Sequence, residues 1–375
     1  MLGLAIFCAQ FPSFLLSIAG GVVSDRNNRY KVLLTTQIAS LVQAIALAAL
    51  VITGQFEVWH ILSLSVILGV INAFDVPARQ SMVYDMMPHK DDVPAAIALN
   101  SSMVHVARLV GPALSGVVLE TWGASVCFSI NAASFIAVII SLLMMQLPTY
   151  KKTPRTSNVL TDLKNGFTYL KNTPSINRVM IMLALISLLS LPYITLLPVC
   201  AKEIFAGNAS VFGYLNSFIG LGAIGGAYYL AAQKNGTDLK SILFTNTILF
   251  GAGLLAFSYA TSLPLALLFL IITGFGMMSQ TTISNTLIQM TVAPSMRGRV
   301  ISYYAMAFFG MQPIGSLLIG ASSSRIGPQN TMLIQGAITI IIALIFAPFL
   351  KARMLRRRHK MKIAQLEEHT VETSG

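Results

Sequence analysis

Charged side chains are scarce in this sequence of 375 residues. They make up 10% of it, whereas apolar side chains make up 55% and the mean hydropathy is +0.73. Soluble globular proteins carry about 25% charged residues. The shortage of charge therefore excludes an ordinary soluble domain and indicates a chain that lies in a lipid bilayer.

Cysteine and the residues of catalytic centres are also scarce. Cys8, Cys127 and Cys200 stand singly in apolar segments, without the spacing of a metal site or a disulfide framework. The phosphate-loop pattern Gly-x-x-x-x-Gly-Lys-Ser/Thr does not occur. We therefore expect no catalytic residue, no metal, no cofactor and no drive by ATP. A membrane enzyme would require a cluster of His, Asp or Cys at one depth, and it is the less favoured alternative.

Long apolar stretches are abundant. A bilayer core of about 30 Å is crossed by roughly 20 apolar residues in a helix. Of nine charge-free stretches, one (241–296) is long enough for two spans broken near Pro264, and a further span (93–119) is interrupted only by Arg108. The sequence thus predicts an all-α polytopic membrane protein with about eleven transmembrane helices. The charge-free stretches are 1–23, 32–56, 58–74, 121–150, 179–201, 204–233, 241–296, 300–324 and 326–350.

The positions of the 25 Lys and Arg residues predict the orientation of the chain. Twenty-two of them fall in alternate loops on one side, whereas only Lys202 and Arg325 fall on the other side and Arg108 lies within a span. By the positive-inside rule the side rich in cations is cytoplasmic. We therefore expect a multi-pass membrane protein with a cytoplasmic C-terminus. The net charge of +12 reflects this topology and anionic lipid, so no nucleic-acid partner is implied.

The predicted topology places Met1 on the outer side, at the mouth of the first span. No charged segment of the kind that begins a secretory signal stands before this span. We expect that one preceding helix is absent from this chain, so that it has eleven helices of an original twelve and lacks the first. A true eleven-helix protein with an outer N-terminus is the alternative.

One long polar segment divides the chain. The division predicts an N-terminal bundle of five helices (1–150), a cytoplasmic linker (151–178), a C-terminal bundle of six helices (179–350) and a basic cytoplasmic tail (351–375). In the linker, apolar residues at helical spacing predict an amphipathic helix on the inner membrane face, with an ordinary solvated linker as the alternative. These residues are Val159, Leu160, Leu163, Phe167 and Leu170.

The two halves share one pattern. Pro112 and Pro313 lie at matching places in their halves, and Gly123 and Gly327 end matching outer turns. Internal duplication of this kind is typical of secondary transporters, whose binding site lies between the repeats near the midplane of the bilayer.

The first cytoplasmic loop, residues 20–31, reads GGVVSDRNNRYK. Its small residues allow close helix packing, and Asn27-Asn28 can form a tight turn because Asn tolerates left-handed backbone geometry. The loop resembles the signature Gly-x-x-x-Asp-Arg-x-Gly-Arg-Arg/Lys of the major facilitator superfamily. Four residues match the signature, whereas Asn28 replaces its second glycine and Tyr30 one of its basic residues. The matching residues are Gly21, Asp25, Arg26 and Arg29.

The resemblance implies that this loop is a conformational latch. In the superfamily the loop forms a charge latch with the helix ends around it, which stabilises the outward-open state. Carried over to this sequence, Asp25 and Arg29 would pair with Asp75 at the inner end of another helix. The alternative is that these charges only set the topology.

Two further segments resemble a narrower branch of the superfamily, the transmembrane secretion effectors, which includes enterobactin exporters. They are residues 74–80 (FDVPARQ), whose Arg79 we assign to the latch, and residues 96–101 (AIALNS). The resemblance runs from about residue 5 to residue 350. It implies a major facilitator fold of two pseudo-symmetric helix bundles, from which the first helix alone is missing.

Residues 108–116, RLVGPALSG, resemble the antiporter signature Gly-Pro-x-x-Gly-Gly of superfamily exporters. Gly111, Pro112 and Gly116 match, and Ser115 stands in place of one glycine. Pro112 removes a backbone hydrogen bond and bends the helix, and we expect Ala107, Gly111 and Ser115 to form a ridge for close helix contact. The resemblance implies an exporter, whereas an ordinary proline bend is the alternative.

Polar residues within the spans are candidates for a substrate cavity. Ser101, His105 and Arg108 share one helix face, and a cation in the membrane needs a cavity or a partner. We expect Arg108 to contribute to recognition of an anionic substrate, with snorkelling to the cytoplasmic end as the alternative. Three amides are weaker candidates for the cavity, and most others are expected to pair helices. The three are Asn216, Gln280 and Gln312.

No carboxylate lies at mid-membrane in the predicted spans. A proton carrier would therefore be a residue of the absent helix, which we place first, or Asp75, Glu120 or His105. The predicted function is a secondary transporter that exports a siderophore or a hydrophobic drug by alternating access, driven by protons. A remnant of such an exporter that does not transport is the alternative.

Overall fold

The computed structural model describes residues 2–85, 93–145, 159–233, 238–293 and 296–372 of the chain. Every regular element in these residues is helical. In chain order the elements are α1 (Leu2–Arg26), α2 (Arg29–Thr53), α3 (Val58–Asp85), α4 (Val93–Met144), α5 (Val159–Asn172), α6 (Pro174–Leu189), η2 (Leu191–Leu196), α7 (Leu197–Glu203), α8 (Ala209–Ala231), α9 (Leu239–Ser258), α10 (Leu263–Thr291), α11 (Arg297–Ala305), η4 (Met306–Gly310), α12 (Met311–Ile326) and α13 (Pro328–Glu372).

The helices confirm the predicted all-α membrane class. Within the described residues, nine helical segments are long and apolar enough to cross a bilayer. One of them contains two legs, because Gly123 adopts a left-handed backbone with φ of 81° inside α4. Helix α1 is also apolar along its first turns. The other eight segments, the two legs of α4 and α1 together make the eleven spans that the sequence predicts.

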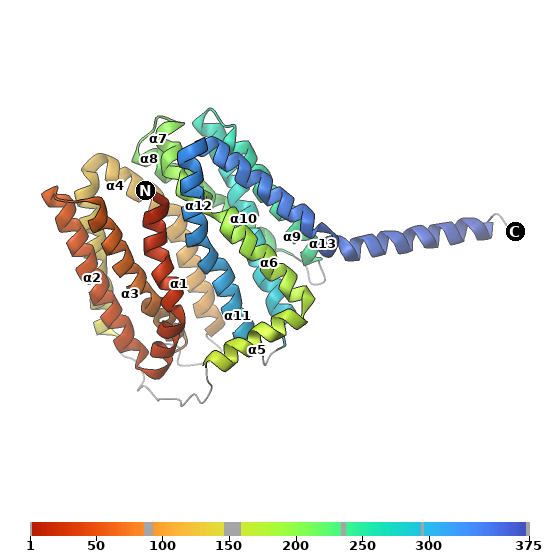
Figure 1. Cartoon of the computed structure of the whole chain (residues 1–375), viewed down its shortest axis with the longest axis horizontal. Coiled ribbons are helices and arrows are strands. Elements are labelled where there is room, and N and C mark those ends of the chain that lie inside the picture. Colours follow the sequence, from red (N-terminus) through yellow and green to blue (C-terminus); the bar gives the residue numbers. More distant parts are fainter. Residues whose placement is uncertain (1, 86–92, 146–158, 234–237, 294–295, 373–375) are drawn as a thin grey trace.

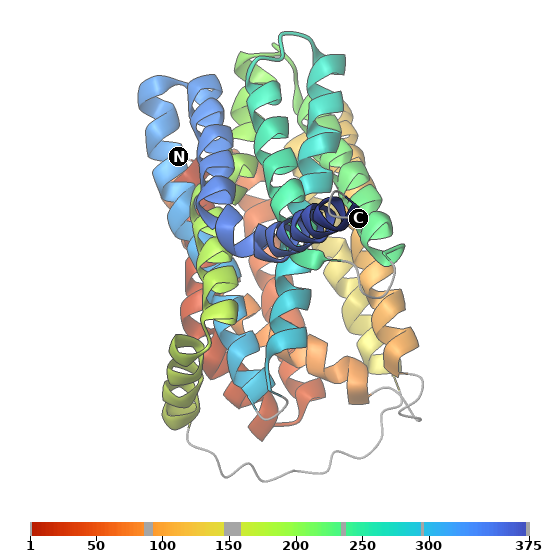
Figure 2. The same cartoon turned by 90° about the vertical axis from the view of Figure 1, so that its right-hand side faces the viewer.

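Successive spans run in opposite directions, so the turns gather at two ends of the molecule (Figure 1). We call one end the basic face; it carries the turn between α1 and α2, helix α5, and the first residues of α6, α9 and α11. The opposite face carries the turn at Gly123 and the turn between α7 and α8. Figure 2 shows α5 at the lower end of the same arrangement, beside the C-terminal helices.

The turn at the start of α2 is made differently from the prediction. Asn28 does not adopt left-handed geometry; its backbone is extended, with φ of −65°. Its side-chain oxygen accepts hydrogen bonds from the backbone N–H groups of Tyr30 and Lys31, at 3.0 and 3.4 Å. Asn28 therefore ends the turn as the N-cap of α2, where its side chain satisfies N–H groups that have no partner within the helix.

Close helix packing in the C-terminal bundle depends on glycine. A methyl group added at Gly222 of α8 would overlap the Ile271 carbonyl oxygen, and one at Gly274 of α10 would overlap that of Ile219. Each helix thus places a glycine against the backbone of the other. Gly222 and Gly226 together form a packing motif, because Gly226 also lies against α10.

Helix α5 occupies the segment for which the amphipathic helix was predicted, and it contacts α11. Gly166 lies 3.1 Å, measured from an added Cβ, from the side chains of Arg299 and Tyr303. The Tyr169 hydroxyl accepts a hydrogen bond of 3.1 Å from the backbone N–H of Ala293. These contacts fix α5 to the C-terminal bundle at the basic face, so this part of the linker is not an ordinary solvated segment.

Candidate functional site

Helix α1 of the N-terminal bundle lies against α12 of the C-terminal bundle. A Cβ added at Gly3 would overlap the carbonyl oxygen of Ser316, and Gly320 lies close to the same glycine. Gly310, the last residue of η4 before α12 begins, faces the ring of Phe14 near the middle of α1. The two bundles therefore touch from the opposite face to about mid-depth along this pair.

A second contact joins α4 to α8 near the opposite face. A Cβ added at Gly116 would lie 2.7 Å from the Ala209 carbonyl oxygen, and one at Gly213 would lie 2.6 Å from that of Pro112. Pro112 and Gly116 are four residues apart, so both face α8. Two of the three residues assigned to the antiporter-like kink thus lie at the junction of the bundles.

The predicted contact ridge on this helix was wrong. Gly111 has open space within 4 Å of an added Cβ, and Ala107 and Ser115 are exposed. The face that meets α8 begins one residue later, at Pro112 and Gly116. Small residues occur on both faces of this apolar helix, so their spacing alone did not identify the face in contact.

Glu120 links the bundles by side-chain hydrogen bonds at the end of this contact. Its carboxylate accepts one bond from the Asn208 amide and one from the Ser210 hydroxyl. Asn208 also caps α8, because its side-chain oxygen accepts a hydrogen bond of 3.4 Å from the backbone N–H of Val211. The carboxylate of one bundle is therefore tied to the N-terminus of a helix in the other.

The described part of the predicted latch centres on Asp75, which is buried in α3. One carboxylate oxygen accepts hydrogen bonds from the Thr36 hydroxyl at 2.9 Å and the Gln37 amide at 2.6 Å, both on α2. The other accepts from the Arg79 guanidinium at 3.1 Å (Nε) and 2.7 Å (NH2). The carboxylate is thus held by three side chains, and the latch residue Arg79 pairs with it one turn away on the same helix.

The remaining latch residues divide into described and undescribed ones. Gly20, rather than Gly21, makes the close approach, because a Cβ there would overlap the Ala73 carbonyl oxygen whereas Gly21 faces open space. Arg29 begins α2. The side chains of Asp25 and Arg26 lie outside the described residues, and the predicted pairing of this loop with Asp75 stays a prediction.

The cavity candidates differ in environment. The side chains of Ser101, His105 and Arg108 lie outside the described residues. Asn216 is half-buried on α8, three residues beyond the junction residue Gly213, and its amide donates to the Phe212 carbonyl at 3.0 Å. Gln312 is half-buried on α12.

Gln280 is completely buried in α10. Its Nε2 lies 3.4 Å from the Ser284 hydroxyl, and its Oε1 has no hydrogen-bond partner among the described residues. A buried amide oxygen without a partner carries a desolvation cost of about 1–3 kcal/mol. The role of Gln280 in a substrate cavity stays a prediction.

A break in the helix that runs from α6 into α7 was not predicted. Pro192 has no N–H, so the Leu188 carbonyl loses its helical donor. The Tyr193 N–H bonds to the Ser190 carbonyl at 3.2 Å, which leaves the Leu189 carbonyl to accept from the Gln335 amide of α13 at 3.0 Å. The signals were a proline in an apolar span and a glutamine in another, but the sequence did not show that they meet.

The break lies beside the junction of the bundles. The Thr195 hydroxyl, in η2, donates to the Ser316 hydroxyl at 3.1 Å, and Ser316 is the residue that Gly3 of α1 contacts. Gly315 lets α12 approach the Leu188 carbonyl. The interrupted helix, α12 and α1 are therefore in one chain of contacts.

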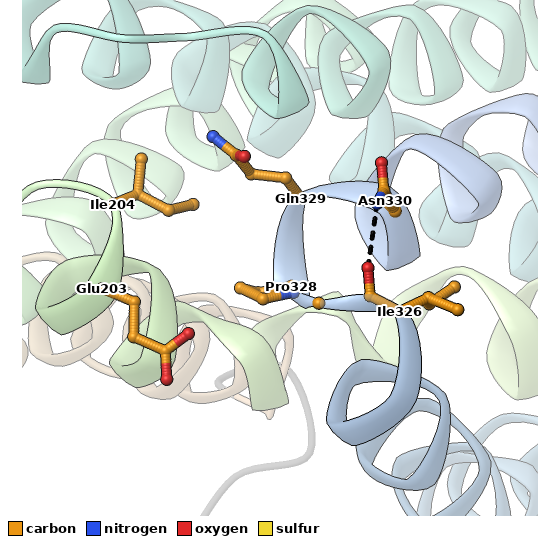
Figure 3. Close-up of a pocket in the computed structure, with 7 residues that line it drawn as sticks. Glu203, Ile204, Ile326, Pro328, Gln329 and Asn330 are labelled. Carbon is orange, nitrogen blue, oxygen red and sulfur yellow. Dashed lines mark hydrogen bonds between the residues drawn. The ribbon is translucent and has the colours of Figure 1, made fainter.

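A pocket of about 200 Å³ opens at the opposite face between α7 and the turn from α12 to α13 (Figure 3). Glu203 and Ile204 line one side, and Pro328 and Gln329 the other. The Asn330 amide donates to the Ile326 carbonyl at 2.9 Å, so this group serves the turn. The pocket belongs to the C-terminal bundle alone and does not lie at the junction. In the described residues no three His, Cys, Asp or Glu side chains are grouped to hold a metal ion.

A sequence model of the family described as transmembrane secretion effector matches residues 1–374. The chain is 27% identical to the staphyloferrin A transporter of Staphylococcus aureus, over 97% of this chain and 89% of that one. It is 19% identical to macrolide efflux protein A of Streptococcus pyogenes, over 92% and 86%. It is 23% identical to an enterobactin exporter of Citrobacter koseri, over 92% and 82%.

Solved structures are similar in fold. The crystal structure of a POT family transporter in complex with 5-aminolevulinic acid matches with a TM-score of 0.73 at 14% identity, and the match covers 92% of this chain and 88% of that one. At this identity the likeness establishes the fold alone. It confirms the predicted arrangement of two helix bundles.

Proposed function

Because this chain belongs to the transmembrane secretion effector family of major facilitators, we propose that it exports a small molecule across the bacterial inner membrane by alternating access, driven by protons. The observation that carries the proposal is the junction of the two bundles. The contacts of Gly3 and Gly116, with the bonds of Glu120, close the molecule toward the opposite face. Two bundles that meet at one end can rock against each other so that this end opens while the other closes, which is the motion that alternating access requires.

A siderophore is the substrate that we propose first. The support is the similarity to the staphyloferrin A transporter and to an enterobactin exporter, over nearly the whole chain. In this proposal Arg108 assists recognition of an anionic substrate, and Asn216, Gln280 and Gln312 supply polar contacts. A hydrophobic drug is the second candidate, supported by the similarity to macrolide efflux protein A.

Glu120 is the proton carrier that the geometry favours. Of the predicted carriers, Asp75 is bonded within the N-terminal bundle, whereas Glu120 is bonded to the other bundle. An ionised carboxylate accepts from both Asn208 and Ser210. A protonated one has an O–H that must itself donate, so the junction loses an acceptor. Protonation at this site would thereby weaken the closed junction and couple the proton to the motion.

Everted membrane vesicles that contain the full chain test the proposal. We expect a proton gradient to drive accumulation of staphyloferrin A, and an uncoupler to abolish it. Glu120→Gln should remove gradient-driven accumulation while exchange of substrate down its own gradient continues. Glu57→Gln is the matched control, because Glu57 is an exposed carboxylate that bonds to Trp59 within its own bundle. Accumulation of neither staphyloferrin A nor a macrolide, or accumulation that ignores the uncoupler, would overturn the proposal.

A further inference from the structure

Two cations share one aromatic ring at the basic face. The Phe349 ring of α13 lies 4.1 Å from the Lys240 ammonium, and 5.3 Å from the central carbon of the Arg178 guanidinium, both measured to the ring centroid. Lys240 belongs to α9 and Arg178 to α6, so three helices converge on the ring. Phe349 also packs against both large apolar clusters of the C-terminal bundle, which fixes the ring in place.

The group lies at the depth of a lipid headgroup. Lys240 is in the first turn of α9 and Arg178 is in the second turn of α6, and both helices begin at the basic face. Phe349 is the last residue but one of the apolar span Pro328–Leu350. All three residues therefore lie where an apolar span ends and the polar membrane surface begins.

The local charge is positive. Among the described residues, no carboxylate forms an ion pair with Arg178 or Lys240. Asp238, two residues before Lys240, is half-buried at the start of α9 and makes no side-chain cap bond. The N-termini of α6 and α9 add positive partial charge at the same end. Two like charges over one ring repel each other, and an anion between them would relieve that repulsion.

An exposed apolar row leads from this group toward the middle of the bilayer. Ile345 and Ile341 precede Phe349 by four and eight residues on α13, so the three share one face. Their exposed fractions are 68% for Ile345 and 52% for Ile341. The row could hold an acyl chain, which a free phosphate ion does not have.

We propose that Arg178 and Lys240, positioned by the Phe349 ring, bind the phosphate of an anionic lipid headgroup, with the acyl chain along Ile345 and Ile341. The guanidinium can donate two parallel hydrogen bonds to phosphate oxygens, and the ammonium adds a point charge. The ring holds both cations in place while no lipid is bound. The lipid would then brace α6, α9 and α13 at the basic face.

Binding of phosphatidylglycerol to the purified full chain in detergent tests this site. Dissociation constants come from titration, monitored by the rise in melting temperature, with phosphatidylcholine and inorganic phosphate as parallel probes. Loss of two cations in Arg178→Gln/Lys240→Gln should weaken phosphatidylglycerol binding by about thirtyfold. Lys202→Gln/Arg325→Gln removes the same charge at the opposite face and should change it less than about twofold.

The outcomes separate the sources of phosphate. Phosphatidylglycerol that binds the double variant as tightly as the natural chain overturns the site, and so does an equal loss in the control variant. Protection by inorganic phosphate alone, equal to that by the lipid, overturns the lipid assignment. Should the double variant not fold, Phe349→Leu keeps an apolar side chain in the core and removes the ring. That variant should also bind the lipid more weakly.

Discussion

At the scale of single residues, Asp75 shows how an acid is tolerated inside an apolar bundle. The cost of burying a carboxylate falls when it is hydrogen-bonded and paired. Thr36, Gln37 and Arg79 provide both conditions. Arg79 is well exposed, with 59% of its side chain open, so its ion pair is weaker than a fully buried one. The bonds from α2 therefore contribute much of what holds this carboxylate.

Removal of the Asp75 carboxylate should destabilise the fold. Asp75→Ala leaves the Thr36 and Gln37 donors without their buried acceptor, and we expect the free energy of unfolding to fall by about 2 kcal/mol. Thermal and denaturant unfolding of the detergent-solubilised chain measures this change. Glu57→Ala alters an exposed carboxylate near the other end of α3 and should change stability by less than about 0.5 kcal/mol. Equal stability of the two variants would show that the Asp75 bonds do not hold α2 against α3.

At the scale of elements, the interruption between α6 and α7 is held by a helix far away in the chain. Gln335 donates to the Leu189 carbonyl, and the Thr339 hydroxyl donates to the Ser190 hydroxyl at 2.7 Å. A broken helix inside a membrane needs such partners, because the freed backbone groups have no water to bond. Helix α13 thus supplies the groups that allow the break to persist.

Loss of the Gln335 amide should expose this dependence. In Gln335→Leu the Leu189 carbonyl has no donor, and we expect the free energy of unfolding to fall by about 1–3 kcal/mol. The rate of amide hydrogen exchange should increase more in residues 189–196, which form the break, than in the preceding residues of α6. Gln312→Leu makes the same substitution at a half-buried position on α12 and should leave exchange in residues 189–196 unchanged. Unaltered exchange in Gln335→Leu would show that the break does not depend on the Gln335 hydrogen bond.

At the scale of the whole molecule, the two faces differ in charge and belong to opposite sides of the membrane. With the proposed orientation, only the opposite face is reached from outside an intact cell. Asn27 lies at the basic face and Gln55 at the opposite face, and both are exposed in turns. In a background in which Cys8, Cys127 and Cys200 are replaced by alanine, an impermeant maleimide added to intact cells should label Gln55→Cys. Asn27→Cys should be labelled only after the membrane is permeabilised.

Two outcomes of the labelling experiment would contradict the predicted topology. Labelling of both positions from the same side would contradict the alternation of spans, and labelling of Asn27→Cys alone from outside would reverse the orientation. The positive-inside rule favours the expected result, because most Lys and Arg residues lie in the loops of the basic face.

The sequence by itself determined the class of the protein and the number and order of its spans. A helix that crosses a bilayer must be apolar along the membrane, so the order of apolar and polar residues predicts where it begins and ends. The predicted break near Pro264 is an example, because α10 begins at Leu263. The family resemblance carried by residues 74–80 and 96–101 is confirmed in the same way by the match over residues 1–374.

Only the tertiary structure decided which face of each helix meets another. In lipid a helix can be apolar all round, so the pattern that reveals the buried side of a soluble helix is absent. That is why Gly116 rather than Gly111 meets α8, and why Gln335 could not be matched to Leu189 from the sequence. The composition of a helix is the same whichever of its faces meets a neighbour. The rotation of the helix about its axis is set by packing against helices that come together only in the folded chain.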